Sequence, residues 1–161
     1  DGAYTMFDQG ADKYYISNYV YNEDIRYRLM VAPFTVRTID NDNDGNNGAF
    51  IAPMVLDSNR DLLYSDYSNG TTFRIRRYSN IKSGTIGRTS LPDPLLTAPP
   101  NAFAVSSYTT ASTTLLVGTR LGRLLRLTTA DVTPVWADIS GPSFVGSISD
   151  VEYGAPIMKF L

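Results

Sequence analysis

One pattern repeats three times along the chain, and it constrains the fold more than any other sequence feature. Each copy holds an apolar strand, a short polar turn and a second strand in which arginine alternates with apolar residues. The copies span residues 15–29, 63–78 and 115–127. They are offset by about 48 and 53 residues when Tyr19, Tyr67 and Arg120 are aligned. A repeat of roughly 40–50 residues with about four strands is typical of a β-propeller blade, and chance similarity between hairpins of a β-sandwich is the alternative.

The residues between the copies predict the remaining strands of each blade. Short apolar segments with the composition of buried inner strands lie at 49–57, 102–106 and 144–151. Outer strands are expected at 35–39, 84–89 and 135–139. The predicted blades therefore span approximately 1–40, 41–95 and 96–140, with the start of a further blade at 141–161.

Composition also predicts an all-β chain. Aspartate is far more frequent than glutamate and arginine far more frequent than lysine, while serine, threonine and tyrosine are abundant. Glutamate and lysine are the charged residues that usually fill exposed helix positions, whereas tyrosine and threonine favour strands and aspartate favours turns. The fold class that we predict is all-β, with about three four-stranded blades of a larger, incomplete propeller.

The length indicates that further structure covers the ends of this assembly. Closed propellers usually need 4–8 blades, and 161 residues supply about three. We expect the chain to open in the middle of one blade and to stop just after the inner strand of another. An open sheet face exposes apolar side chains and unpaired edges, so remaining blades or a larger assembly are expected to cover it.

Several classes of function are excluded by what the sequence lacks. The chain has no histidine and no cysteine, which removes Ser-His-Asp and Cys-His catalysis, zinc sites of the His/Cys type, iron–sulfur clusters and disulfides. The net charge of −2 argues against a nucleic-acid partner, because duplex binding normally needs a basic surplus. No run approaches the roughly 18 apolar residues of a membrane span.

Three stretches of the third repeat resemble BNR/sialidase-like propellers. They are Thr114–Thr119, Gly122–Leu127 and Pro134–Ser140. The likeness is greatest to propeller domains of large secreted proteins of Bacteroidetes-type bacteria, many of which leave the cell through the type IX secretion system. The resemblance implies a secreted or cell-surface location. The family's Asp-box is not intact: Trp136 stands where its last residue would fall, but the preceding Asp and Gly are missing.

An acidic loop predicts a calcium site. Residues 40–46 read Asp-Asn-Asp-Asn-Asp-Gly-Asn, which matches the start of a loop that surrounds calcium with oxygen ligands. The candidate ligands are Asp40, Asp42 and Asp44. The bidentate acid that ends an EF-hand loop is absent, because Ile51 stands at that position. A solvated turn between an outer strand and the next inner strand is the alternative.

The sequence gives less evidence for catalytic residues than for a calcium loop. Glycosidases use two carboxylates across a cleft, and no spacing in this sequence selects a pair. The carboxylates considered are Glu23, Asp57, Asp66, Asp150 and Glu152, of which Asp57 and Asp150 could face a channel mouth.

Arginine and tyrosine side chains are the other candidates. The segment Phe73–Arg76 is similar to a sialidase element whose arginine binds a sugar carboxylate, but its proline is missing. Strand alternation instead places Phe73 and Ile75 inside the blade, and Arg74 and Arg76 outside it. A group of tyrosines could stack on sugars or pack between blades. These tyrosines are Tyr14, Tyr15, Tyr19, Tyr21, Tyr64, Tyr67 and Tyr78.

The sequence therefore predicts a non-catalytic, secreted or cell-surface propeller segment that binds a protein or glycan partner. It could also be a type IX secretion passenger held in a larger assembly. The alternative is a fragment of a glycoside hydrolase or sialidase-like enzyme whose active residues lie outside this chain. Calcium is the only cofactor that the sequence suggests.

Overall fold

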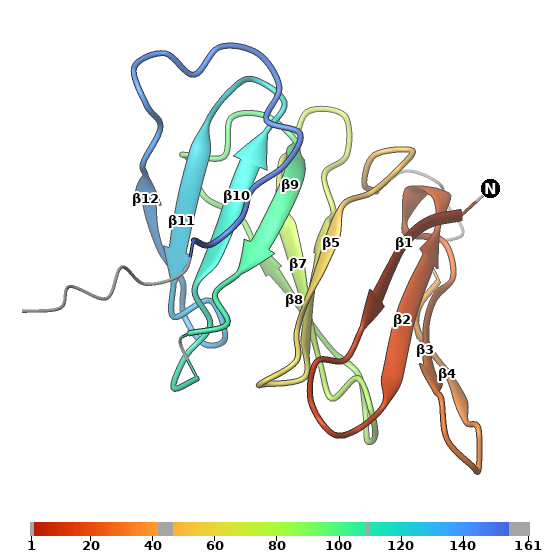
Figure 1. Ribbon diagram of the computed structural model, residues 1–161. Coiled ribbons are helices and arrows are strands. Elements are labelled where there is room, and N and C mark those ends of the chain that lie inside the picture. The colour runs from red at the N-terminus through yellow and green to blue at the C-terminus, as the bar shows by residue number, and fades with distance from the viewer. Residues whose placement is uncertain (1, 42–46, 109, 155–161) are drawn as a thin grey trace, which may run out of the picture.

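Twelve strands form three antiparallel sheets in the computed structural model, which describes residues 2–41, 47–108 and 110–154 (Figure 1). The only helical element among these residues is a short 3-10 turn, η1 (Val20–Asn22). The prediction of an all-β chain built from four-stranded units is confirmed.

Each sheet is a meander in which consecutive strands pair side by side. The first sheet holds β1 (Gly2–Phe7), β2 (Tyr14–Tyr19), β3 (Ile25–Leu29) and β4 (Val36–Asp40). The second holds β5 (Met54–Asp57), β6 (Leu62–Asp66), β7 (Ile75–Ser79) and β8 (Gly87–Leu91). The third holds β9 (Pro100–Val105), β10 (Leu115–Thr119), β11 (Leu124–Thr128) and β12 (Val135–Asp138).

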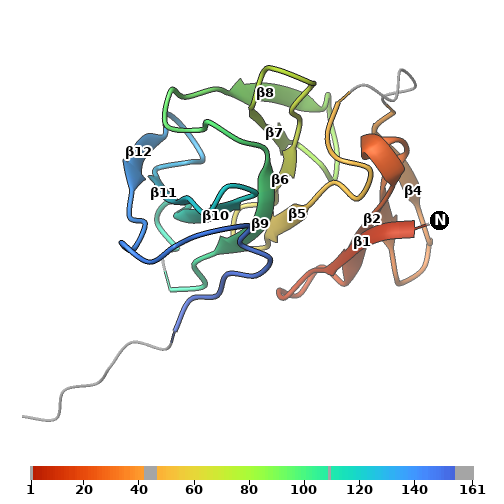
Figure 2. The same ribbon diagram turned by 90° about the horizontal axis from the view of Figure 1, so that it is seen from above.

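The three sheets pack face to face in sequence order, with the second in the middle (Figure 1). The first strand of the second sheet, β5, contacts both β1 and β9, and Figure 2 shows β5 and β9 side by side. No sheet closes on itself. The middle position explains why every residue of β6 is buried, whereas β2 alternates between buried and partly exposed residues.

Two separate apolar cores join the sheets. The core between the first and second sheets includes Tyr14, Ile16, Ile25, Leu63 and Tyr78. The core between the second and third includes Leu62, Tyr64, Leu115, Val117 and Leu127. Leu63 and Leu62 are neighbours on one strand and enter different cores, because successive side chains of a strand point to opposite faces.

The prediction that the chain opens in the middle of a blade is wrong. β1 pairs with β2 and completes the first sheet. Sequence reasoning missed this strand, although Tyr4 and Met6 alternate with polar or small residues and both pack against the first core.

The prediction of an inner strand at 144–151 is also wrong. This segment forms no strand but runs along the outer face of the third sheet, where the Ile148 amide donates to the Thr119 carbonyl at 3.0 Å. Gly118 on β10 makes room for it, because a Cβ there would stand 2.5 Å from Cγ2 of Ile148. The segment therefore covers part of a sheet face that was expected to lie open.

The structure also corrects the alignment of the third repeat. The backbone amides of Tyr19, Tyr67 and Thr119 donate equivalent hydrogen bonds across their hairpins, to the carbonyls of Glu23, Arg74 and Arg123. Thr119, and not Arg120, is therefore the counterpart of Tyr19 and Tyr67.

Candidate binding surfaces

Asp40, the first residue of the predicted calcium loop, joins the first sheet to the second. Its carboxylate accepts hydrogen bonds from the Tyr78 hydroxyl at 2.8 Å and from Arg76 and Arg88 at 3.2 Å each. Asp40 is only 8% exposed. Asp42 and Asp44 lie outside the described residues, and within the described part no group of three or more acidic side chains is placed to hold a metal. The calcium loop stays a prediction.

Three of the five carboxylates considered for catalysis line cavities, each a different one, so no two of them face each other across a cavity. Asp57, Asp66 and Asp150 each line a separate cavity. Glu152 and Glu23 line none of these three. Asp57 is buried, and its two oxygens accept hydrogen bonds from the Thr113 hydroxyl and the Asn59 amide.

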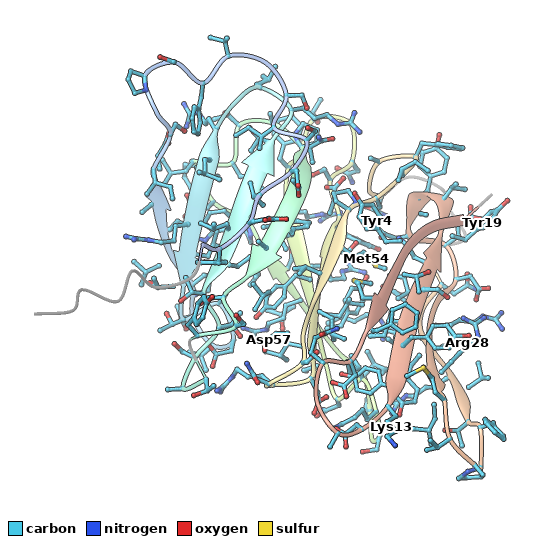
Figure 3. All side chains as sticks on the ribbon, in the orientation of Figure 1. Tyr4, Lys13, Tyr19, Arg28, Met54 and Asp57 are labelled. Carbon is cyan, nitrogen blue, oxygen red and sulfur yellow. The ribbon has the colours of Figure 1, made fainter. Side chains whose placement is uncertain are left out.

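The Asp57 cavity lies where the first strands of all three sheets end. It measures about 210 Å³, and Asp57, which is labelled in Figure 3, is one of its lining residues. Gln9 follows β1, Ser58 follows β5 and Ser106 follows β9, so hydroxyl and amide groups from three sheets surround it. Leu56 and Val105 line the same cavity with apolar side chains.

Asp66 forms the base of a smaller cavity, of about 170 Å³, between the second and third sheets. Its carboxylate accepts the backbone amides of Ala49 and Ser68, both at 2.9 Å. Burial raises the pKa of Asp66 above its ordinary value, while the hydrogen bonds from Ser68 and Ala49 and the charge of Arg120 act in the opposite direction. Phe73 and Arg120 line the same cavity.

The third cavity, about 450 Å³, lies between the segment 143–151 and β11. Leu124, Phe144 and Ile148 supply apolar walls, and Asp150 lies at the margin. Asp150 is exposed, and its carboxylate accepts only the amide of Val151 among the hydrogen bonds of the described residues.

The outer face of the first sheet, which we call the open face, carries a row of four adjacent side chains. Phe7 lies opposite Tyr15, Tyr15 opposite Arg28, and Arg28 opposite Val36. The rings of Phe7 and Tyr15 are 5.8 Å apart, and the Arg28 guanidinium lies 5.7 Å from the centre of the Tyr15 ring. Arg28 also donates to Ser17 at 2.6 Å. Phe7 and Val36 are more than half exposed.

The matching rows of the other two sheets are packed against a neighbour. In the second sheet the row is Leu56, Leu63, Tyr78 and Arg88, and in the third it is Val105, Leu115, Leu127 and Trp136. Leu63, Tyr78, Leu115 and Leu127 are fully buried between sheets. Figure 3 shows Arg28 on the side of the first sheet that faces away from the rest of the molecule. The open face thus has the composition of a contact surface, and no sheet formed by the described residues covers it.

The prediction that Arg74 and Arg76 point outward is wrong. Both lie over the ring of Tyr67, at 5.2 and 3.2 Å from its centre, and Arg76 forms the ion pair with Asp40. Arg76 thereby joins β7 to β4, whereas Arg74, just before β7, donates to the Tyr67 carbonyl at 2.9 Å and to the Asn47 side chain at 3.0 Å. Ile75 is fully buried, as predicted.

The sequence left open whether the tyrosines stack on sugars or pack between blades, and the structure separates them into a buried and an exposed group. Tyr14, Tyr64, Tyr67 and Tyr78 are buried between sheets and cannot form a platform. The remaining three are partly or well exposed: Tyr15, Tyr19 and Tyr21.

Comparison with protein-family models, curated proteins and solved structures returned no match for this chain. Among the described residues, no helix is both long and apolar enough to cross a membrane.

Proposed function

We propose that the chain is a β-propeller segment that serves as a non-catalytic binding or adhesion module, secreted or exposed at a bacterial cell surface. Three successive four-stranded meanders with neighbouring first strands support the propeller assignment. The secreted location and the role of a type IX passenger are proposed from the resemblance of the third repeat alone.

The observation that carries the binding role is the exposure of the open face. Its row Phe7, Tyr15, Arg28 and Val36 occupies positions that are contact surfaces in the other two sheets. Large apolar patches rimmed by polar groups mark interaction sites. Tyrosine and arginine are, with tryptophan, enriched at energetically important positions of interfaces. The partner is a protein or glycan surface, and remaining blades or a secretion assembly are the protein partners that would suit this face.

Binding of the fluorescently labelled chain to a glycan array and to bacterial cells tests the proposal. The double variant Tyr15→Ser/Arg28→Ser removes the centre of the open face. The matched control Tyr108→Ser/Arg126→Ser removes an exposed tyrosine and an exposed arginine from the third sheet and its loops. We expect a loss of at least tenfold in binding for the open-face variant only. Absence of binding by the wild type, or an equal loss in both variants, contradicts the proposal.

A further inference from the structure

The open face repeats the pattern of donors that the second sheet presents to the first. Next to the row that holds Arg28, a second row of the open face crosses β2, β3 and β4 with Ser17, Arg26 and Thr38. The matching row crosses β6, β7 and β8 with Ser65, Arg76 and Ser90. Arg26 therefore holds the position of Arg76, and Arg28, two residues further along the same strand face, holds the position of Tyr78.

In the second sheet these two positions bind a carboxylate of the preceding sheet. Asp40 is the last residue of β4 and lies opposite Ile25 of β3. Tyr78 and Arg76 donate to its carboxylate at 2.8 and 3.2 Å. The end of the fourth strand of one sheet thus supplies the acceptor for two donors on the third strand of the next.

The contact between the second and third sheets is an apolar version of this arrangement. Leu91 holds the place of Asp40 at the end of β8. It is buried in the core that also contains Leu125 and Leu127, which hold the positions of the two donors in the third sheet. An acid therefore ends the fourth strand where the next sheet carries donors, and a leucine ends it where the next sheet carries leucines.

The first sheet lies at one end of the row of sheets, so no preceding sheet among the described residues supplies an acid to its open face (Figure 1). Arg28 donates to Ser17 at 2.6 Å and lies over the Tyr15 ring, and within the described part no carboxylate pairs with it. A guanidinium has five N–H donors, so this bond leaves others available. Arg26 pairs with Asp24, but the two side chains are 40% and 39% exposed, and such exposed pairs add little stability.

A second copy of this chain does not offer an acid at the required position. The outer face of the third sheet is the one that a second copy could present, and the segment 144–151 lies over part of it. Ile139, whose amide donates to the Leu124 carbonyl, holds the place of Asp40 there. Docking through the third sheet would therefore set an isoleucine against Arg28.

We propose that the open face packs against a β-sheet of a protein partner whose fourth strand ends in an aspartate or glutamate, and that this carboxylate binds Arg28 and Arg26. The inference rests on the proposed binding role of the open face and names its partner as a protein sheet. Arginine suits this contact because its planar guanidinium can donate two parallel hydrogen bonds to one carboxylate. Phe7 and Val36, both more than half exposed, supply the apolar part of the contact.

Binding of the labelled full chain to bacterial cells separates this inference from the binding role itself. Arg28→Gln should lose at least tenfold in binding, while the matched control Arg126→Gln, at an exposed arginine of the third sheet, should bind like wild type. Protease treatment of the cells should abolish binding, and periodate oxidation of their glycans should not. Binding that survives the protease but not periodate keeps the binding role and overturns the protein sheet as partner. Absence of binding by the wild type overturns both.

A duplicated first sheet supplies a partner of known sequence. Residues 2–53, which lead into β5, are fused in front of Gly2 of the full chain so that they lead into β1 in the same way. The chain has no cysteine, so Val36→Cys in the original sheet, at a position that is 58% exposed, gives a single site for maleimide labelling. We expect the added sheet to slow this labelling at least tenfold, and Asp40→Asn in the added copy to restore most of the rate.

The control for the duplicated chain is Val135→Cys on β12, at a position that is 63% exposed, whose labelling should not change. Labelling of Val36→Cys at the same rate with and without the added sheet overturns the proposal. Protection that persists with Asp40→Asn overturns the part assigned to the carboxylate.

Discussion

The hydroxyl of Tyr78 donates a hydrogen bond of 2.8 Å to the carboxylate of Asp40, and this contact joins β7 of the second sheet to β4, the last strand of the first. Arg76 and Arg88 bind the same carboxylate. Three donors from the second sheet therefore depend on one acceptor from the first. Burial and the charge of Asp40 raise the pKa of Tyr78 well above its ordinary value, so the hydroxyl stays a donor at physiological pH.

Replacing Asp40 should destabilise the fold more than replacing Tyr78. Asp40→Asn leaves Arg76 and Arg88 without their negative partner, and we expect a loss of about 2–4 kcal/mol in the free energy of unfolding. Tyr78→Phe removes one buried hydrogen bond and should cost about 1–2 kcal/mol. Urea denaturation of both single variants and of the double variant measures the coupling. Strictly additive losses would contradict a shared network.

Alkaline pH should unfold the protein through its buried tyrosines. Burial raises the pKa of Tyr64 to about 12, and the pKa of Tyr14 is raised further by burial and by its hydrogen bond to Asp61. Above pH 10 these phenols ionise in the unfolded chain but stay protonated in the folded one, so stability falls as pH rises through this window. Spectrophotometric titration should show their ionisation together with the loss of circular dichroism. Complete phenolate formation in a folded protein would contradict the burial.

Asp66 should contribute a pH dependence of the opposite kind from a salt-bridged carboxylate. Because its pKa is raised above the ordinary 3.8, the folded state holds a proton that the unfolded state has already released. The Asp66 contribution to stability therefore falls as pH rises from about 4 through the folded-state pKa. Melting temperatures of wild type and Asp66→Asn, measured across this range, should converge at low pH and diverge as pH rises. A constant difference would show that titration of Asp66 is not involved.

Gly118→Ala should release the segment 144–151 from the third sheet. The new Cβ would collide with the branched side chain of Ile148, so the segment has to move away from β10. We expect faster proteolysis in this segment, with the three sheets retained. Val132→Ala, at an exposed position in the loop between β11 and β12, is the control. Unchanged cleavage in Gly118→Ala would mean that the segment adjusts without leaving.

Calcium remains to be tested at the loop that begins with Asp40. If the loop binds the ion, a hundredfold excess over the dissociation constant stabilises the fold by roughly 2.7 kcal/mol. Thermal melts of wild type with and without millimolar calcium should then differ, and Asp42→Ala should remove the difference. Equal melting of wild type in both conditions favours a solvated turn. Asp40 is unsuitable for this test because its replacement also breaks the contact with Arg76.

The strand pattern was predictable because it depends on local alternation. The strands Tyr14–Tyr19 and Leu62–Asp66 both begin with three apolar or aromatic residues, and a hairpin turn rich in Asn or Gly follows each of them. The stretch 144–151 looked equally suitable for a strand, yet whether it pairs depends on neighbouring strands that local sequence does not specify. Gly118 indicates that another segment packs closely against β10, but the sequence alone does not show that this segment is 144–151.

The roles of charged side chains were harder to predict, because they depend on residues far apart in the chain. Asp40 was assigned to a metal from its acidic neighbours, whereas its contacts with Arg76 and Arg88 join two sheets.

The middle position of the second sheet has a consequence for how a disturbance spreads. The core that this sheet shares with the first and the core that it shares with the third have no residue in common. Adjacent residues such as Leu62 and Leu63 serve one core each, and β5 contacts both β1 and β9. Coupling between the outer sheets therefore passes through the second sheet as a whole. The protein behaves as a chain of nearest-neighbour couplings, in which the second sheet transmits to one outer sheet whatever loosens the other.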